Sequence, residues 1–334
     1  MKFSFSSGNW WLFLGLYSIL SLYVVYEQAT DLYAIPLPEQ VARHERLLAG
    51  NSEFFNPWQY RVFSTYMVEG FYKTLNSISD QIDITKSFLL FRVFQTILIL
   101  IIAHSYFLAL GIRNPWLVLM GVLLLGFSMA HSVFQSDLSV NTYFDIFFYL
   151  LAGLLIIKER LIWIVPLMLL AALNRETSLL IPAMLIIPFV HWKPFSIPKT
   201  PFLIAVISTL LFFAVFISVR LYYGYRPAEG INGMTGFTDY LSFNLRFLKV
   251  YPELIGTVAF LPIITILFLK RIPRLLQQWF WVVCPAWFLI HFAFSTAVES
   301  RLFLVPQALI FIPAFLWLIE NWYANPGVNT ESQA

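Results

Sequence analysis

The segment Leu161–Trp192 reads LIWIVPLMLLAALNRETSLLIPAMLIIPFVHW, an apolar run broken only by the polar stretch Asn174-Arg175-Glu176-Thr177. As one helix it would be about 48 Å long at 1.5 Å per residue, which is longer than a bilayer core requires. We therefore predict two short helices, Leu161–Leu173 and Ser178–Trp192, that meet at the polar turn. This hairpin decides the fold, because a single span here would invert the sidedness of everything that follows.

The composition of the whole chain places most of it in lipid. Hydrophobic residues make up 59% of the 334 positions and charged residues 12%, against about 45–50% and 25% in soluble domains. These values exclude a soluble enzyme, a disordered chain and a disulfide scaffold. The single cysteine, Cys284, cannot form an internal disulfide, and a net charge of +3 is too small to indicate a nucleic-acid partner.

Six uncharged segments outside the hairpin are long enough to be membrane helices. They are Phe3–Tyr26, Val93–Ile112, Asn114–Ser136, Pro201–Val219, Leu275–Val298 and Leu302–Ile319. Leu138–Ile157, Leu254–Leu269 (extended back through Tyr251) and the two hairpin arms raise the expectation to about ten membrane helices. We predict an all-α polytopic membrane bundle that forms a single integral membrane domain over residues 1–334. The first segment is expected to be a span rather than a cleaved signal.

The basic residues predict which side of the membrane each connection occupies. With the N-terminus inside, the short inner connections carry nine basic residues and one acid, as the positive-inside rule requires. The outer side then receives the longer loops 27–86, 131–142, 220–250 and 296–301. Function is expected at this outer face, because polar chemistry is concentrated in the loops there.

Two outer loops have features of their own. The loop 27–86 is expected to contain two amphipathic surface helices, Glu39–Ala49 and a second one that starts at Pro57. A simpler interpretation is that this loop caps the bundle and that Tyr60 and Arg61 are interface anchors. The loop 220–250 contains several glycines and is expected to be a flexible, lid-like segment.

The polar turn is the most informative feature for function. Arg175 and Glu176 lie between apolar runs too short to lift them clear of the bilayer, and charges at that depth normally face a protein interior or a watery cavity. One interpretation is a structural ion pair with a helix cap. The other is a recessed site in which Asn174 and Arg175 meet an anion and Glu176 positions it or a partner.

Further polar residues collect in the remaining outer turns. His131, Asp137, Asn141 and Asp145 surround the third outer connection, with Asp145 expected to face inward from the mouth of a helix. Glu299 and Arg301 lie in the last outer turn. Their spacing contains no metal-binding motif. Ordinary loop polarity and ion-pair anchoring are the simpler interpretations of these residues.

Arginines and carboxylates together suit one kind of chemistry. Guanidinium groups bind phosphate oxygens with paired hydrogen bonds, and a carboxylate can take a proton from an attacking hydroxyl. We therefore predict group transfer from a lipid phosphate at an outer site bounded by Asp31, Arg61, the turn 174–177 and the turn Glu299–Arg301.

The pattern resembles the polytopic GT-C glycosyltransferases, which use polyprenyl-phosphate-linked sugars. The likeness rests on the long first outer loop, the short inner turns, and the stretches Trp58-Gln59-Tyr60-Arg61-Val62-Phe63 and Asn174-Arg175-Glu176-Thr177. It implies that the acid early in the first loop, here Asp31 with Glu27 nearby, is the catalytic base. The family often has a paired acidic motif at this point, whereas Leu32 and Tyr33 follow Asp31 here.

The resemblance implies further properties of the reaction. The expected mechanism is an inverting transfer with no obligatory cofactor, from a polyprenyl-phosphate sugar to a glycan, lipid or protein acceptor. A divalent metal bound by Asp31 and a second outer acid is left open. The expected location is a bacterial inner membrane with the active site on the periplasmic side. Asp31 and Glu176 are thus the candidate catalytic residues, and the candidate binding residues are Tyr60, Arg61, His131, Asp137, Asn174, Arg175, Glu299 and Arg301.

Three other functions use the same residues differently. A transporter or flippase for a lipid-linked sugar or another anionic amphiphile would need the arginines but no base. A membrane acyltransferase would use His131 or His104 as its base, although neither has a recognisable acyltransferase spacing. A non-catalytic assembly subunit is the third alternative.

Overall fold

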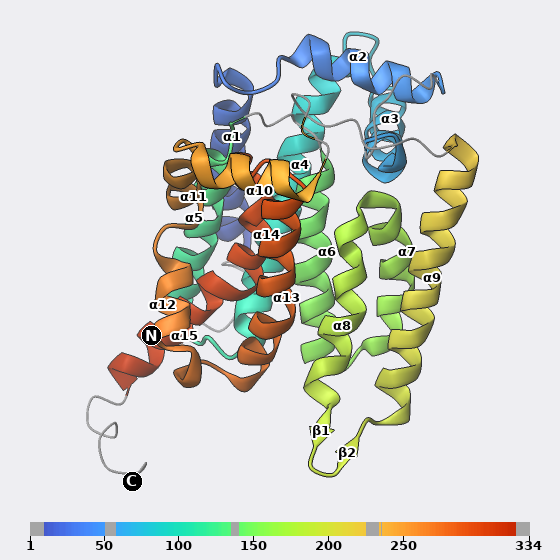
Figure 1. Ribbon diagram of the computed structural model, residues 1–334. Coiled ribbons are helices and arrows are strands. Elements are labelled where there is room, and N and C mark those ends of the chain that lie inside the picture. The colour runs from blue at the N-terminus through green and yellow to red at the C-terminus, as the bar shows by residue number, and fades with distance from the viewer. Residues whose placement is uncertain (1–9, 51–57, 135–139, 225–233, 235, 325–334) are drawn as a thin grey trace.

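The computed structural model describes residues 10–50, 58–134, 140–224, 234 and 236–324, and this part of the chain is almost entirely helical. The only strands in these ranges are β1 (His191–Trp192) and β2 (Phe195–Ser196), which pair in antiparallel fashion. Most of the apolar helices run side by side in one bundle (Figure 1). The predicted all-α class is confirmed.

Five helical segments of the described chain are long and apolar enough to cross a membrane, as in an integral multi-pass membrane protein. They are α1 (Trp10–Thr30), α4 (Ile84–Ala109), α9 (Lys199–Tyr223), α13 (Arg274–Ala293) and the run Ser300–Asn321. The last run consists of η7 (Ser300–Phe303), α14 (Leu304–Pro306), the π-helical turn η8 (Gln307–Phe311) and the beginning of α15 (Ile312–Ala324). Two shorter apolar helices, α5 (Pro115–His131) and α6 (Val140–Ile157), belong to the same bundle.

The predicted hairpin is present. Its first arm consists of η2 (Leu161–Trp163) and α7 (Ile164–Asn174), and its second of η3 (Glu176–Leu179), α8 (Leu180–Ile186) and η4 (Ile187–Phe189). Between them the backbone of Arg175 is extended, with φ −164° and ψ 147°. The second arm ends at Phe189 rather than at the predicted Trp192, because Trp192 pairs with Phe195 in the β-hairpin.

The break between the two arms leaves backbone carbonyls that need partners, since unsatisfied groups are costly in lipid. The Tyr149 hydroxyl on α6 donates to the Thr177 carbonyl over 2.6 Å. The Ser178 hydroxyl donates to the Arg175 carbonyl over 2.7 Å. The turn is therefore stabilised by partners of its own.

A second apolar segment is broken where the sequence predicts one span, Leu254–Leu269. The structure has two helices, α11 (Val250–Val258) and α12 (Leu261–Leu267), bent by 70°. Ala259 between them has a positive φ of 52°, which is uncommon for a residue other than glycine. Pro262 lies in the first turn of α12, where its missing N–H lets a new helix begin.

Surface helices gather at one end of the bundle. The first is α2 (Leu37–Leu48), which matches the predicted Glu39–Ala49 and is followed by Gly50 at φ 66°. The prediction of one continuous helix from Pro57 is wrong. Its start lies outside the described residues, and the chain forms η1 (Trp58–Tyr60) and α3 (Val62–Asn76) because Arg61 leaves helical geometry at ψ 59°.

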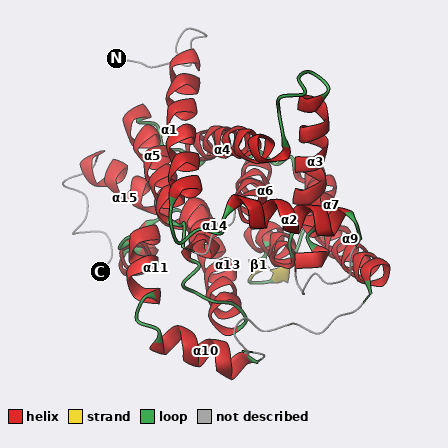
Figure 2. Ribbon diagram, turned by 90° about the horizontal axis from the view of Figure 1, so that it is seen from above, coloured by secondary structure: helices red, strands yellow, loops and turns green. Residues whose placement is uncertain are grey.

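Surface helices therefore cover one end of the bundle, and the β-hairpin lies at the opposite end. In Figure 1, α2, α3 and α10 (Phe237–Arg246) lie at one end, and β1 and β2 lie at the opposite end. Figure 2 looks along the bundle axis, and in this view α2, α3 and α10 are seen lengthwise. These three helices therefore lie across the bundle axis. Of the expected lid-like loop 220–250, residues 225–233 and 235 lie outside the described residues, whereas α9 extends to Tyr223 and α10 occupies Phe237–Arg246.

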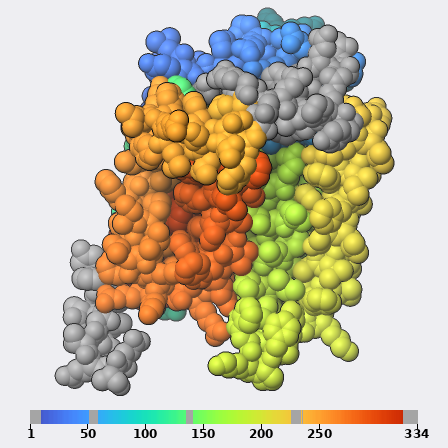
Figure 3. Space-filling view, in the orientation of Figure 1, coloured from blue at the N-terminus to red at the C-terminus, as the bar shows by residue number. Residues whose placement is uncertain are grey.

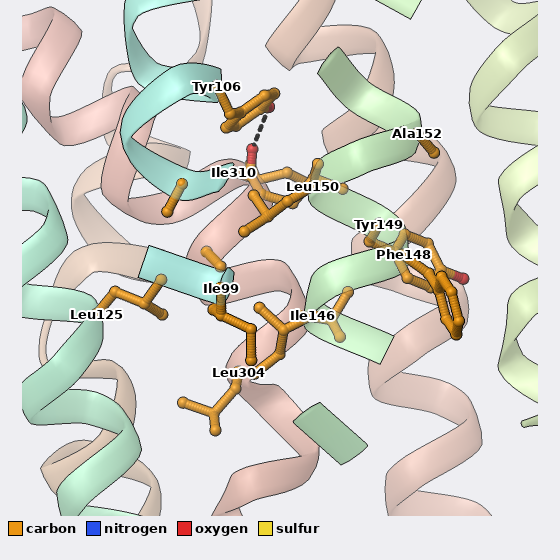
Figure 4. Packing of buried hydrophobic residues seen from close by; sticks show 14 of the residues in the cluster. Ile99, Tyr106, Leu125, Ile146, Phe148, Tyr149, Leu150, Ala152, Leu304 and Ile310 are labelled. Atoms are coloured by element: carbon orange, nitrogen blue, oxygen red, sulfur yellow. Dashed lines mark hydrogen bonds between the residues drawn. The ribbon is translucent and has the colours of Figure 1, made fainter. Parts of the chain in front are cut away.

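Packing separates an inner core from an exposed apolar flank. Helix α9 runs along one edge of the molecule with its side chains on the surface (Figure 3). Ile99, Leu125, Ile146 and Leu304 are fully buried at the centre of the bundle (Figure 4). There the Tyr106 hydroxyl donates to the Leu309 carbonyl over 2.7 Å, which joins α4 to the π-helical turn.

Candidate functional site

The polar turn surrounds a single buried carboxylate, Asp145 on α6. The Asn174 amide donates to one of its oxygens over 2.8 Å. Arg175 Nη1 and the Thr177 hydroxyl donate to the other oxygen over 3.0 and 3.3 Å. The Asp145 side chain is only 2% exposed. Both oxygens of a buried charge are thus bonded to the turn, as burial requires.

Glu176, the remaining charged residue of the turn, faces away from Asp145 and meets two other arginines. Arg61 donates to one Glu176 oxygen from Nε over 3.3 Å and from Nη2 over 3.2 Å. Arg220 Nη2 donates to the other oxygen over 3.2 Å. The Glu176 side chain is 30% exposed. It connects the outer-loop segment before α3 to the end of α9.

Aromatic rings hold Arg220 in place. Its guanidinium carbon lies 3.4 Å from the Phe216 ring centroid and 4.3 Å from the Tyr60 ring centroid. Tyr60 is itself fixed, because its hydroxyl donates to the Gly224 carbonyl over 2.9 Å. A stacked guanidinium keeps its edge N–H groups available for an anion.

A fourth arginine, Arg301 on η7, lies at the same end of the bundle. Its Nη2 donates to Glu299 over 2.6 Å, and the Thr296 hydroxyl donates to the other Glu299 oxygen over 2.7 Å. Arg301 interacts electrostatically with Arg175. We call Arg61, Arg175, Arg220 and Arg301 the arginine cluster; their carboxylate partners are Asp145, Glu176 and Glu299. Within the described residues each of the four arginines is bonded to a carboxylate, and Arg61 and Arg220 share one, Glu176.

Asp31 lies elsewhere, in a surface pocket of about 290 Å³. The residues lining it are Tyr23, Glu27, Asp31, Tyr33, Ala130, His131, Val133, Phe134 and Glu253. We call this the acidic pocket. Asp31 directly follows α1, and one of its carboxylate oxygens accepts the Tyr33 backbone N–H over 2.6 Å. The His131 ring nitrogen Nδ1 lies 2.9 Å from the Phe127 carbonyl.

A cation borders the acidic pocket. The Lys249 amine lies 3.9 Å from the Tyr33 ring centroid and 3.7 Å from the Phe134 ring centroid, and 4.0 Å from a Glu253 oxygen. Across the described ranges, no group of three or more His, Cys, Asp or Glu side chains is arranged to hold a metal ion.

A further set of buried polar contacts involves Gln28, Arg92 and Tyr143. Gln28, one helical turn before Asp31, hydrogen-bonds to the Tyr143 hydroxyl on α6 and donates to the Met129 carbonyl over 3.1 Å. Arg92 on α4 donates to Gln28 over 2.9 Å, and its guanidinium carbon lies 3.1 Å from the Tyr143 ring centroid. These contacts join α1, α4 and α6 inside the bundle.

The structure thus divides the single site expected from the sequence into two. Tyr60, Arg61, Asn174, Arg175 and Glu176 come together, with Glu299 and Arg301 beside them. Asp31 and His131 line the acidic pocket instead, whose lining residues include no arginine. Asp145 faces inward as expected, and it and Asn141 both contact Asn174. Asp137 lies outside the described residues.

Sequence reasoning missed Arg220 as a site residue. Its only signal is position, because it is the single charged residue after Lys199 in α9 and follows Phe216 by one helical turn. That placement is equally typical of an interface anchor. Compared with models of known families, with curated proteins and with solved structures, the chain matches none of them.

Proposed function

We propose that the protein is a GT-C-type membrane glycosyltransferase with about ten membrane helices. In this proposal α5, α6, the two arms of the hairpin and the bent pair α11–α12 also lie within the bilayer. The end that carries α2, α3 and α10 would face the periplasm of a bacterial inner membrane. The observation that carries the proposal is the arginine cluster, in which four guanidinium groups gather at one end of an apolar bundle.

An arginine cluster at this depth suits a lipid phosphate. Buried charge in a membrane protein is expensive and is normally kept for a function. Guanidinium groups match phosphate oxygens, and they stabilise the negative charge that grows on a departing phosphate. A polyprenyl chain would remain in lipid beside the bundle while its phosphate reaches the cluster.

Asp31 is the better candidate for the base. It lies in an open pocket, whereas Glu176 accepts hydrogen bonds from two arginines and is better suited to position them. The proposed step requires the acidic pocket and the arginine cluster to close around one donor, because the anomeric carbon is bonded directly to the phosphate oxygen. An acceptor hydroxyl oxygen then forms a bond to that carbon and gives its proton to Asp31. The bond between that carbon and the phosphate oxygen breaks, and its electron pair stays on the phosphate.

The acceptor would enter through the acidic pocket, whose aromatic side chains Tyr23, Tyr33 and Phe134 provide surfaces for a sugar ring. No cofactor is required by this step. A divalent metal bound by Asp31 and Glu253 is the alternative, and it predicts that a chelator abolishes transfer.

The test is release of free polyprenyl phosphate from a panel of polyprenyl-phosphate sugars by the purified protein. Asp31→Asn should lower turnover roughly 10²–10⁴-fold, the usual range for loss of a general base. Asp80→Asn is the matched control, because Asp80 is an exposed acid between α3 and α4. Undiminished turnover in Asp31→Asn would exclude Asp31 as the base.

The same preparation separates the transfer proposal from the flippase alternative. A flippase would move the lipid-linked sugar across vesicle membranes, release no polyprenyl phosphate and tolerate Asp31→Asn. That combination of results would replace the glycosyltransferase proposal.

A further inference from the structure

Glu176 is more exposed than Asp145, and its bonds to arginine are slightly longer than the 3.0 Å bond between Arg175 and Asp145. Its bonds to Arg61 and Arg220 measure 3.2–3.3 Å, whereas charge-assisted N–H···O bonds are typically about 2.7–2.9 Å. Its side chain is 30% exposed. Arg61 Nε and Nη2 both donate to the same Glu176 oxygen, so the geometry is not the paired one that carboxylates prefer.

Arg220 is fixed without help from Glu176. Phe216 and Tyr60 both contact its guanidinium face, and the Tyr60 hydroxyl is anchored on Gly224. Its position would therefore persist if Glu176 moved away, which is the preorganisation a binding site needs.

An exposed apolar stripe leads along α9 to Arg220. Leu210, Phe213 and Ile217 follow each other at spacings of three and four residues, and all three are exposed. Arg220 continues that spacing. This stripe lies on the helix that forms one flank of the molecule (Figure 3), so an alkyl chain in the bilayer could lie along it with its headgroup beside Arg220.

We propose that Arg61 and Arg220 bind the phosphate headgroup of an alkyl or polyprenyl phosphate that approaches along α9, and that Glu176 competes with phosphate for these arginines. The ligand class rests on the proposed function; the competitor and the route along α9 are additional to it. A phosphate monoester carries about −1.5 to −2 charges and three acceptor oxygens, so it satisfies two guanidinium groups better than one carboxylate does.

This competition means that Glu176 lowers the affinity of the two arginines for phosphate. While both arginines are bonded to Glu176, that carboxylate excludes phosphate, so the apparent affinity for phosphate is proportional to the fraction of time that Glu176 is displaced. Removing the carboxylate charge should therefore tighten binding. After transfer, the return of Glu176 to the arginines would favour release of the lipid phosphate.

The experiment titrates the purified full chain in a neutral detergent with dodecyl phosphate by calorimetry. Glu176→Gln should bind about tenfold more tightly than wild type, the gain expected if Glu176 occupies the arginines about nine-tenths of the time. Arg220→Gln should bind about tenfold more weakly. Glu69→Gln is the matched control, because it removes one acid at the same end of the bundle and should change affinity less than about twofold.

Two further arms keep the result interpretable. Glu176→Asp retains the charge but shortens the side chain, so binding should tighten by less than in Glu176→Gln; this covers the case in which Glu176→Gln does not fold. Inorganic phosphate replaces dodecyl phosphate in the second arm. Weaker binding of inorganic phosphate supports the stripe on α9, and equal binding overturns that part of the proposal.

Unchanged or weaker binding in Glu176→Gln or Glu176→Asp overturns the competition. So does a wild type that binds no dodecyl phosphate. The outcome is separable from the proposed function. Tightened binding in Glu176→Gln without any sugar transfer supports the phosphate site and contradicts the glycosyltransferase proposal. Sugar transfer without tightened binding supports the glycosyltransferase proposal and contradicts the competition at Glu176.

Discussion

Asp145 and Glu176 are both partnered by arginines beside the same polar turn, but they are held in different ways. Asp145 is buried, and both its oxygens accept bonds from Asn174, Arg175 and Thr177 over 2.8–3.3 Å. Glu176 is partly exposed and accepts longer bonds from Arg61 and Arg220. The comparison separates a fixed ion pair that maintains the turn from an exchangeable one that a ligand can replace.

The largest expected effect comes from Asp145→Asn. It leaves the Arg175 guanidinium buried without its counter-charge, and breaking a buried pair in this way costs about 3–5 kcal/mol. We expect a large loss of thermal stability in detergent, measured by the unfolding midpoint, together with a poor yield of monodisperse protein. The double variant Asp145→Leu, Arg175→Met should recover much of the loss, because both charges are then removed.

The comparison fails if Asp145→Asn is no more destabilising than Glu176→Gln. That result would mean that the two carboxylates are equally dispensable to the fold.

A smaller effect is expected from Tyr60→Phe. It removes the hydrogen bond to the Gly224 carbonyl and loosens the ring that stacks on Arg220. The cost to stability should be about 1 kcal/mol, a typical net value for one hydrogen bond. The unfolding midpoint should fall slightly, and dodecyl phosphate binding should weaken in the same variant. Unchanged phosphate binding would show that Tyr60 does not help to position Arg220.

Glu176→Gln should have about the same effect on stability or less. A partly exposed ion pair contributes about 0–1 kcal/mol, so the unfolding midpoint should change little. The measurement is the same thermal scan used for Asp145→Asn, which makes the two variants directly comparable. A loss as large as that of Asp145→Asn would assign Glu176 to the fold rather than to an exchangeable contact.

The smallest effect concerns an ion pair outside both sites, between His44 on α2 and Glu69 on α3, whose facing atoms are 3.0 Å apart. Burial raises the pKa of Glu69, but hydrogen bonds from His44 and Lys73 outweigh it and leave the pKa below its ordinary value of 4.5. A lowered carboxylate pKa stabilises the fold above the unfolded value, and that contribution is lost as the pH falls below about 4.5.

Glu69→Gln should therefore make stability less sensitive to pH in this range. Thermal unfolding of wild type and Glu69→Gln at pH 7 and pH 4 checks it. Parallel loss of stability in both proteins would contradict the expectation.

The hairpin could be predicted from sequence because charged residues are costly inside a membrane span, so they favour a break in the helix. Arg175 and Glu176 interrupt a segment too long for one span, and the structure breaks there. The bend at Ala259 was not predicted. Pro262 is a sequence signal for a helix boundary nearby, but the length of the apolar run also suits one span, and the positive φ of Ala259 has no counterpart in the sequence.

The division of the site could not be predicted either. Asp31 and Arg61 share the first outer loop, but which cavity each faces depends on where α1 ends and how α3 is oriented. Both depend on tertiary packing rather than on local sequence. Arg220 was missed for the same reason, because only the packed structure brings the end of α9 beside Tyr60 and Glu176.

The most direct test of the account is a structure of the full chain determined with a bound polyprenyl phosphate. We predict phosphate density within hydrogen-bonding distance of both Arg61 and Arg220, with the Glu176 side chain turned away and the bond between Asp145 and Arg175 unchanged. Phosphate density at another place, with Glu176 still bonded to both arginines, would contradict the account.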